Sequence, residues 1–266
     1  MQQILLLKAL FHGRLFYCLF VGCLFSVNAY ASPLCPTNHI DEQVTVRYVH
    51  DGDTLHLRNG DKIRLIGINT PEVARKSHPA EPFANQARDR LRQLIKNNHH
   101  QLGLRMDAEH FDRYGRRLAH LYAQDGSSIS AQLLQDGLAT LLAVPPNLNG
   151  LDCYANTEAQ AQQAGKGIWQ LPRYRVISSS ALPRNSRGYR HVSGKVIRIG
   201  EGRRNLWLNL PNKVAFRIEK KELSLFNTIK PRELLGKTII GRGWLYEHKG
   251  ELRMRLRSDF ALQLSP

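Results

Sequence analysis

Three short patches of the sequence combine side chains that cleavage of a phosphodiester requires. They occupy residues 50–54, 64–72 and 112–116. Such a reaction needs a cation to neutralise the phosphate, hydrogen-bond donors for the charge that builds on its oxygens, and a group that orients or deprotonates water. The patches supply an Asp-Gly-Asp turn, an arginine inside an apolar strand, a Thr-Pro-Glu turn and an arginine after a glycine. Each patch alone would also suit an ordinary turn or a solvated loop, so the hypothesis depends on all three.

The residues around these patches predict a mainly β fold. Short alternating segments fill residues 44–68, where Asn59-Gly60 is a hairpin signal. Apolar residues at helical spacing predict three helices, the second ending at Gly137. The helices are predicted at 83–96, 129–137 and 154–164, and the two further strands at 102–106 and 118–122. Five strands with a helix between the third and the fourth indicate a barrel of the OB type.

A second β-rich region follows a stretch rich in serine, proline and glycine. Residues 173–190 have the composition of a linker. Five segments beyond it alternate or run apolar between turns such as Lys249-Gly250, which predicts a second, barrel-like module. These segments are 192–199, 206–210, 214–218, 238–246 and 252–256. The predicted organisation is a leader at 1–31, a first domain at 32–172, a linker at 173–190 and a β module at 191–266.

The charge of the chain is concentrated in its C-terminal part. The net charge is +16, yet residues 32–172 carry 15 basic and 15 acidic side chains. Residues 173–266 carry 21 basic and 7 acidic side chains, a net charge of +14. Such an excess favours a polyanion, whether nucleic acid, acidic polysaccharide or anionic lipid. Arg253, Arg255 and Arg257 alternate with apolar residues and are the candidate nucleic-acid contacts, because alternation puts them on one strand face.

The first 31 residues have the pattern of a signal peptide. Lys8 and Arg14 precede an apolar run, and Ala29-Tyr30-Ala31 offers a small-x-small cleavage site. The run is shorter than the roughly 20 residues that span a bilayer. We therefore expect export to the periplasm or the medium and no stable membrane insertion after cleavage. The alternative is a lipoprotein anchored through Cys23, whose preceding residues form a poor lipobox.

Cleavage of the leader leaves two cysteines, Cys35 and Cys153. Two cysteines in an oxidising compartment favour a disulfide. Two unpaired, partly buried thiols are the alternative.

In their order, the three patches resemble the staphylococcal nuclease-like family. That family carries an Asp-Gly-Asp-Thr turn, an Arg-Leu…Asp-Thr-Pro-Glu strand end and a Tyr-Gly-Arg loop. The resemblance extends over residues 44–169 and includes the closing run Ala-Gly-Lys-Gly-Ile-Trp at 164–169. It implies an OB-type barrel with three helices, one calcium ion per site, and hydrolysis of DNA or RNA to products that end in 3′-phosphate.

The resemblance also implies a role for each matching residue. Asp53 and the carbonyl of Thr70 would bind calcium, which prefers hard oxygen donors. Arg64 and Arg116 would bind the scissile phosphate, and Glu72 would orient or deprotonate the attacking water. The residues with implied supporting or substrate-contacting roles are Asp51, Asp112 and Tyr114.

The sequence departs from the family pattern at two places. Asn69 stands where the family usually has a second aspartate ligand. An amide oxygen can still coordinate the ion, but one negative charge is lost, so we expect weaker calcium binding. Ala143 and Pro145 align with tyrosines of the family's nucleotide-binding loop, so base stacking should differ.

Two function classes follow from these patterns. The leading hypothesis is an exported calcium-dependent nuclease held on DNA or RNA by its basic module, with no obligate protein partner evident. The rival is a non-catalytic nucleic-acid-binding protein on the same fold, which the change at Asn69 favours and the retention of Arg64, Glu72 and Arg116 opposes. Binding of polysaccharide or lipid alone would leave the three patches unexplained.

Overall fold

The computed structural model describes residues 32–76 and 78–265. Contacts divide the chain into Met1–Ser32 and Pro33–Pro266, and the description concerns the second of these units. The predicted signal peptide and Cys23 lie outside the described residues. Across the part that is described, no helix is both long and apolar enough to cross a membrane.

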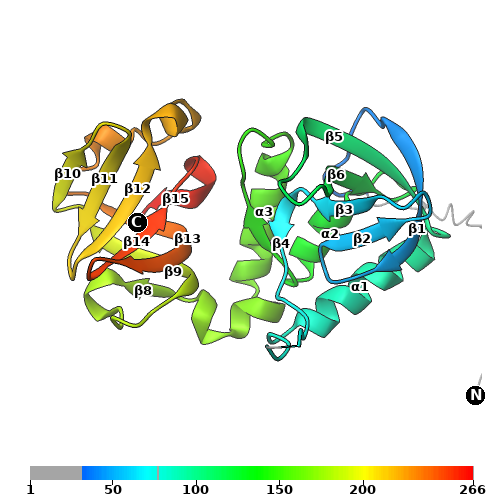
Figure 1. The fold of residues 1–266 in the computed structure, drawn as a ribbon, viewed down its shortest axis with the longest axis horizontal. Coiled ribbons are helices and arrows are strands. Elements are labelled where there is room, and N and C mark those ends of the chain that lie inside the picture. The colour runs from blue at the N-terminus through cyan, green and yellow to red at the C-terminus, as the bar shows by residue number, and fades with distance from the viewer. Residues whose placement is uncertain (1–31, 77, 266) are drawn as a thin grey trace, which may run out of the picture. The chain divides into compact units, whose positions relative to one another are not determined.

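The first β structure is a closed barrel, which confirms the predicted fold class. Within the described residues five strands close it in the order β1-β2-β3-β6-β5 (Figure 1), with β3 and β6 parallel. The strands are Glu42–Val49 (β1), Thr54–Leu57 (β2), Lys62–Leu65 (β3), Gln101–Phe111 (β5) and Arg117–Tyr122 (β6). Their alternating apolar residues are buried inside the barrel, as period-two patterning requires.

Three α-helices pack on this barrel, as the apolar spacing predicts. They are Ala84–Asn97 (α1), Ile129–Gln135 (α2) and Leu151–Gln163 (α3). In α2 the side chain of Ser128 accepts a hydrogen bond from the amide of Ala131 and caps the first turn. Ile129, Leu133 and Leu134, the residues expected to face inward, are all buried.

A short two-stranded sheet extends the end of β3. Gly67–Asn69 (β4) pairs antiparallel with Thr140–Leu142 (β7), and Asn69 lies opposite Thr140. Gly67 has a φ of 81°, a conformation in which a side chain would meet Leu151 and Tyr154. The glycine therefore lets β4 pass close to α3, which fixes where the following Thr-Pro-Glu turn begins.

The C-terminal region folds as a further β module. Within the described residues its strands form one eight-stranded sheet in the order β10-β11-β12-β14-β13-β9-β8, with β15 paired to β13. The strands are Val176–Ser178 (β8), Gly188–Lys195 (β9), Arg198–Glu201 (β10), Asn205–Leu210 (β11), Val214–Glu219 (β12), Thr238–His248 (β13), Glu251–Arg255 (β14) and Leu262–Leu264 (β15). The predicted segment 192–199 covers the end of β9 and the start of β10, which the structure separates, and the sequence misses β8 and β15. Since β8 pairs with β9, part of the predicted linker belongs to the sheet, while the domain boundaries themselves stay predictions.

A small aromatic cluster and the 3-10 turns η1 and η2 lie between the barrel and this sheet, and four further 3-10 turns lie within the C-terminal region. The turns are Gly167–Gln170 (η1), Pro172–Tyr174 (η2), Ser179–Ala181 (η3), Lys220–Leu225 (η4), Pro231–Glu233 (η5) and Asp259–Ala261 (η6). Trp169 and Tyr174 pack with Ala161 of α3 and Tyr189 of β9 in one buried cluster. An ion pair between Glu158 of α3 and Arg242 of β13 is almost fully buried beside it. The two β structures are therefore joined by packed side chains as well as by the chain.

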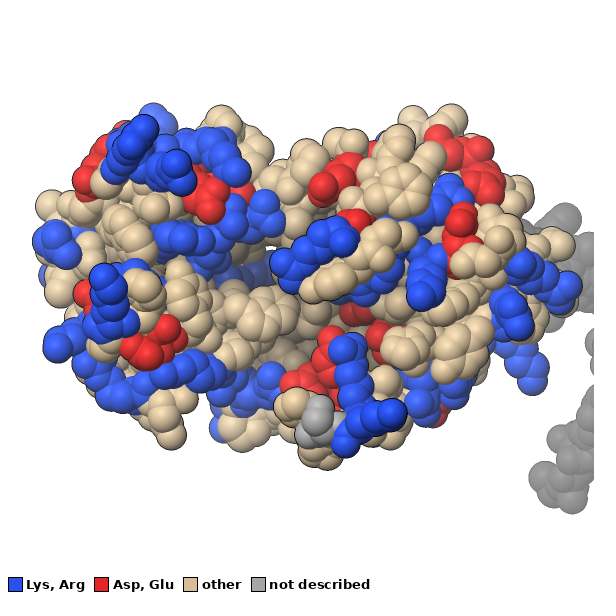
Figure 2. All heavy atoms as spheres, viewed as in Figure 1, with Lys and Arg blue, Asp and Glu red and all other residues tan. Residues whose placement is uncertain are grey.

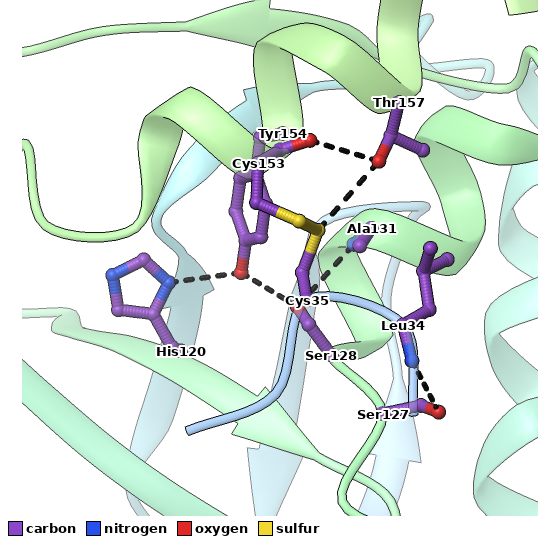
Figure 3. Close-up of a disulfide and its surroundings, with 9 residues drawn as sticks. All are labelled: Leu34, Cys35, His120, Ser127, Ser128, Ala131, Cys153, Tyr154 and Thr157. Carbon is purple, nitrogen blue, oxygen red and sulfur yellow. Dashed lines mark hydrogen bonds between the residues drawn. A yellow bond between two sulfur atoms is a disulfide. The ribbon is translucent and has the colours of Figure 1, made fainter. Parts of the chain in front are cut away.

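The structure contains a disulfide between Cys35 and Cys153 (Figure 3), with their Cα atoms 5.7 Å apart. It ties the segment before β1 to the first turn of α3. Close to it, the hydroxyl of Tyr154 lies 2.6 Å from Ser128 Oγ and 3.0 Å from His120 Nδ1. These contacts lock α3 onto α2 and β6.

Candidate active site

The candidate site begins at the Asp-Gly-Asp turn between β1 and β2. Asp51 Oδ1 accepts a hydrogen bond from the amide of Asp53 at 3.0 Å, which closes the turn. A side chain on Gly52 would meet Thr70 Oγ1 at 2.7 Å and the Ala87 side chain at 2.8 Å. Glycine therefore allows the turn to lie directly on the Thr70 segment.

Asp53 connects the first patch to the second. Its Oδ2 accepts hydrogen bonds from the amide and the hydroxyl of Thr70, at 2.9 and 3.1 Å. The same oxygen lies 3.2 Å from Arg64 Nη2. A second donor of Arg64 bonds to the carbonyl of Leu65 at 2.7 Å. The guanidinium of Arg64 is thus oriented from two sides at the end of β3.

Asp51 and Asp53 are both only 6% exposed. Burial, followed by the neighbouring charge of Asp53, raises the pKa of Asp51 to about 6. Two neighbouring buried carboxylates repel each other, and a divalent cation between them would remove that repulsion. The pair therefore suits a site for a hard metal ion.

Asn69 and Thr70 add neutral oxygens to this pair. Asn69 Nδ2 donates to the carbonyl of Thr70 at 3.3 Å, and Asn69 Oδ1 accepts from Arg64 at 3.5 Å. Over residues 32–76 and 78–265, His, Cys, Asp and Glu side chains form no group of three or more that could hold a metal. A donor set at this place combines two carboxylates with an amide and a backbone carbonyl, which is chemistry that calcium accepts.

The third patch forms a tight loop between β5 and β6. Asp112 Oδ1 accepts hydrogen bonds from the amides of Tyr114 and Arg116, at 2.9 and 3.0 Å. Its Oδ2 pairs with Arg116 Nε at 2.7 Å. Burial alone would raise the pKa of Asp112, but these hydrogen bonds and the charge of Arg116 lower it. Asp112 is therefore a fixed anion that orients Arg116.

One pocket brings the second and third patches together. It has a volume of about 230 Å³, and Arg64, Asp112 and Arg116 line it. Arg64 of β3 and Arg116 of the loop between β5 and β6 can thus reach one bound phosphate, as bidentate donors do. Glu109 of β5 also lines the pocket. Glu109 lies outside the three patches, in a segment with no motif, so no pattern in the sequence indicates it.

Glu72 lies apart from this pocket. Its carboxylate is 56% exposed and pairs with Arg75 at 2.6 Å. Its backbone exchanges hydrogen bonds with Glu81, whose side chain accepts the Glu72 amide at 3.0 Å. The turn that carries Glu72 is therefore held in place, while the side chain is engaged by a neighbouring cation.

Tyr114 is 67% exposed at the tip of the loop. Its hydroxyl accepts a hydrogen bond from Arg113 at 2.6 Å, and the guanidinium of Arg116 lies 5.6 Å from its ring centroid. An exposed ring beside a pocket-lining arginine is suited to contact a nucleotide.

The candidate arginines Arg253 and Arg255 lie in β14 and Arg257 lies two residues beyond its end, and all three are paired with acidic side chains. Arg253 pairs with Glu251 at 2.8 Å and lies over Trp207, 4.7 Å from the ring centroid. Arg255 and Arg257 both pair with the buried Glu222, at 2.8 and 2.9 Å. Figure 2 shows the same mixture over the visible face of the C-terminal module, where red side chains lie among the blue ones. Glutamates therefore neutralise some of the 21 basic side chains, and the net charge of +14 is what remains after this offset.

Comparison of the sequence with known proteins finds relatives that are named as nucleases. Residues 62–171 match the family model described as staphylococcal nuclease homologue. The chain is 30% identical to a thermonuclease of Staphylococcus intermedius over 132 residues, which cover 48% of this chain and 77% of that protein. The chain belongs to the staphylococcal nuclease family.

Two proteins of Bacillus subtilis (strain 168) are also similar to this chain. The SPbeta prophage-derived endonuclease YokF is 33% identical over 136 residues, 49% of this chain and 45% of that protein. Endonuclease YncB is 33% identical over the same length, 49% of this chain and 63% of that protein. The chain thus spans less than half of the first relative and about three quarters of the thermonuclease. Membership in this family supports a nuclease hydrolase activity and nucleic acid as the substrate class.

Proposed function

We propose that the protein is an exported, calcium-dependent nuclease that hydrolyses phosphodiester bonds of DNA, RNA or both and leaves 3′-phosphate ends. The observation that carries this proposal is the convergence of Arg64 and Arg116 on one pocket, next to the buried Asp51 and Asp53.

The two arginines bind the scissile phosphate and stabilise the charge that builds on its oxygens. Asp53 and Asp112 hold the two guanidinium groups through one donor each, at 3.2 and 2.7 Å. Arg64 also donates to the carbonyl of Leu65. The donors that stay free on the two guanidinium groups are available to phosphate, so the arginines are oriented before the substrate arrives. Such preorganisation is what lowers the barrier, since no reorganisation is needed in the transition state.

Asp53, Asn69 and the carbonyl of Thr70 would hold one calcium ion, with Asp51 in support. When bound, the ion supplies positive charge that neutralises the phosphate. Thr70 fixes one oxygen of Asp53 through two hydrogen bonds. The ligands are thereby held in place by the chain itself.

Glu72 orients or deprotonates the attacking water in this proposal. To do so its carboxylate has to leave Arg75, and the pair is solvent-exposed, which makes the exchange inexpensive. Glu109 is the second carboxylate within reach of the substrate, because it lines the pocket. The two glutamates can be distinguished by experiment.

The test is digestion of single-stranded DNA, duplex DNA and RNA by the protein from Ser32 onward, with calcium or with EDTA. Glu72→Gln and Glu109→Gln serve as a matched pair, since each removes one charge and keeps the shape. Cleavage that needs calcium and is lost only in Glu72→Gln supports the assigned roles. Loss only in Glu109→Gln transfers the water-orienting role to Glu109.

A non-catalytic nucleic-acid-binding protein is the second candidate. The pairing of Glu72 with Arg75 and the amide at Asn69 favour it. Tight, salt-sensitive binding without cleavage of any of the three substrates would support this reading and reject the nuclease.

The basic module is proposed to hold the substrate, with Arg253, Arg255 and Arg257 as phosphate contacts. Phosphate contacts release counterions, so binding should weaken steeply as salt rises.

The proposal of export rests on the signal-peptide pattern of residues 1–31. It is tested by locating the mature protein and sequencing its N-terminus.

A further inference from the structure

A second pocket adjoins the candidate active site within the unit Pro33–Pro266. It has a volume of about 380 Å³, and Leu142 and Val144 line both this pocket and the active-site pocket. Because the two pockets share these residues, a flexible chain bound in one can continue into the other. We call the second one the stacking pocket.

Two exposed aromatic rings of β13 line the stacking pocket. Trp244 is 47% exposed and Tyr246 is 36% exposed. Residues two apart in a strand share a face, so both rings lie on one side of β13. The ring of Trp244 packs edge-on against Tyr189, with centroids 5.2 Å apart. The wall from the nuclease domain, residues 141–144, contributes only aliphatic side chains, so surfaces for stacking come from the C-terminal module.

Arginines line the same pocket. Arg217, Arg255 and Arg257 are among its lining residues. Their acidic partners are Glu219 and Glu222, so three cations face two anions and a positive charge remains. Because Glu222 is buried and binds two of the arginines, these guanidinium groups are held in position without substrate.

The walls of the pocket are fixed to each other. The buried pair of Glu158 and Arg242 joins α3 to β13, and Arg242 Nε also donates to the carbonyl of Phe260 at 2.6 Å. Arg257 Nη2 donates to the carbonyl of Pro145 at 3.4 Å, next to the shared residues. The pocket is therefore formed before a ligand binds.

We propose that the stacking pocket binds the single strand of nucleic acid that runs on from the scissile phosphate. Bases stack on Trp244 and Tyr246, and backbone phosphates pair with the arginines beside them. Aromatic faces combined with cations are the usual means of holding single strands. A duplex keeps its bases paired inside, so the pocket favours single-stranded substrates and substrates long enough to fill it. This inference rests on the proposed nuclease function and names the substrate class of that site.

The experiment compares kcat/KM for a trinucleotide and for an oligothymidylate of about 12 nucleotides, using the protein from Ser32 onward with calcium. Trp244→Ala should lower kcat/KM for the longer substrate about tenfold, mainly through KM, because stacking on one base is lost. The trinucleotide should be cleaved as before. Trp244→Phe should keep most of the activity, and Tyr246→Ala is a second variant. The control is Ile197→Ala, which removes an apolar side chain that is 58% exposed in the same module and lines neither pocket.

The inference is overturned if Trp244→Ala and Tyr246→Ala cleave the longer substrate like the wild type, or if both lose activity equally on both lengths. Binding in EDTA separates this result from failure of the nuclease proposal. Titration of the same oligothymidylate, followed by fluorescence anisotropy, should give weaker binding for Trp244→Ala even if the wild type cleaves nothing. Equal affinities of wild type and variant in that titration would reject the stacking pocket on their own.

Discussion

At the scale of single residues, Asn69 sets the charge of the candidate calcium site. An Asn69→Asp variant adds a negative charge beside Asp53, and ligand charge is what tunes calcium affinity in flexible oxygen sites. We expect the calcium dissociation constant, measured by calorimetry, to fall about tenfold. Asn69→Ala is the control, since it removes the amide oxygen and should weaken binding. Equal affinities for the wild type and Asn69→Asp would mean that residue 69 does not coordinate the ion.

Arg116 is distinguished from its neighbours by the geometry of its guanidinium. Asp112 holds it through Nε, which leaves the terminal nitrogens for phosphate. An Arg116→Lys variant keeps the charge but loses the bidentate geometry. We expect kcat to fall about 10²-fold or more, with a smaller change in KM, because the lost contact acts mainly in the transition state. Arg113→Lys is the control on the same loop, and a kcat loss of the same size there would assign the effect to the loop as a whole.

At the scale of elements, β6 carries a histidine that makes stability depend on pH. His120 is buried, and burial lowers its pKa to about 4. The unfolded chain takes up this proton near pH 6.5, and the folded chain takes it up only near pH 4. The free energy of unfolding therefore falls as the pH falls through that window, by about 2 kcal/mol between pH 7 and pH 5 from this residue.

The measurement is urea unfolding at pH 7 and pH 5 for the wild type and His120→Gln. The variant should lose less stability between the two pH values, because its side chain does not titrate. His191 of β9 also has a pKa lowered to about 4, by burial and by Arg242, so some pH dependence should persist in the variant. Identical slopes for the wild type and His120→Gln would show that His120 is not neutral in the folded chain.

The elements that could be predicted from the sequence are those with a repeating apolar pattern. Helix α1 and the barrel strands have such patterns, and the structure confirms them. By contrast, β8 and β15 have three residues each, too few for alternation to be recognised. β8 also lies in a serine-rich segment, where composition favours a linker.

The sequence predicts the parts of the candidate site that lie within a single motif. The turn of Asp51 and Asp53 and the loop of Asp112 and Arg116 are each local, so their internal hydrogen bonds follow from spacing. The engagement of Glu72 by Arg75 and the presence of Glu109 in the pocket depend on side-chain directions that no spacing encodes. The stacking pocket joins residues about 100 positions apart in the chain, so the sequence alone does not show that the aromatic residues of β13 and residues 141–144 line one pocket.

At the scale of the whole molecule, Glu158 connects the C-terminal sheet to the candidate metal site. One carboxylate oxygen pairs with Arg242 of β13, and the other accepts the amide of Leu141 in β7 at 2.7 Å. Leu141 lies opposite Ile68 in β4, directly before Asn69. A buried carboxylate therefore links β13, through two short strands, to the ligands that we assign to calcium.

Replacing either member of this pair leaves the other as an isolated buried charge. We expect Glu158→Leu and Arg242→Met each to lower the free energy of unfolding by about 3 kcal/mol, measured in urea. The double variant should recover part of that loss, because no charge is then left unpaired, although the amide of Leu141 stays without its acceptor. If the losses of the two single variants add up in the double variant, Glu158 and Arg242 do not stabilise each other as a buried ion pair.

The same two variants distinguish the effect of the ion pair between Glu158 and Arg242 on stability from its effect on calcium binding. Arg242→Met leaves the bond between Glu158 and Leu141 in place, so calcium affinity should be close to that of the wild type. Glu158→Leu removes the acceptor of Leu141 as well, which frees β7 and with it β4, so calcium should bind more weakly. Calorimetric titration of both variants well below their unfolding temperatures tests this difference. If Glu158→Leu binds calcium as tightly as Arg242→Met and the wild type, the hydrogen bond between Glu158 and Leu141 does not position the ligands of the ion.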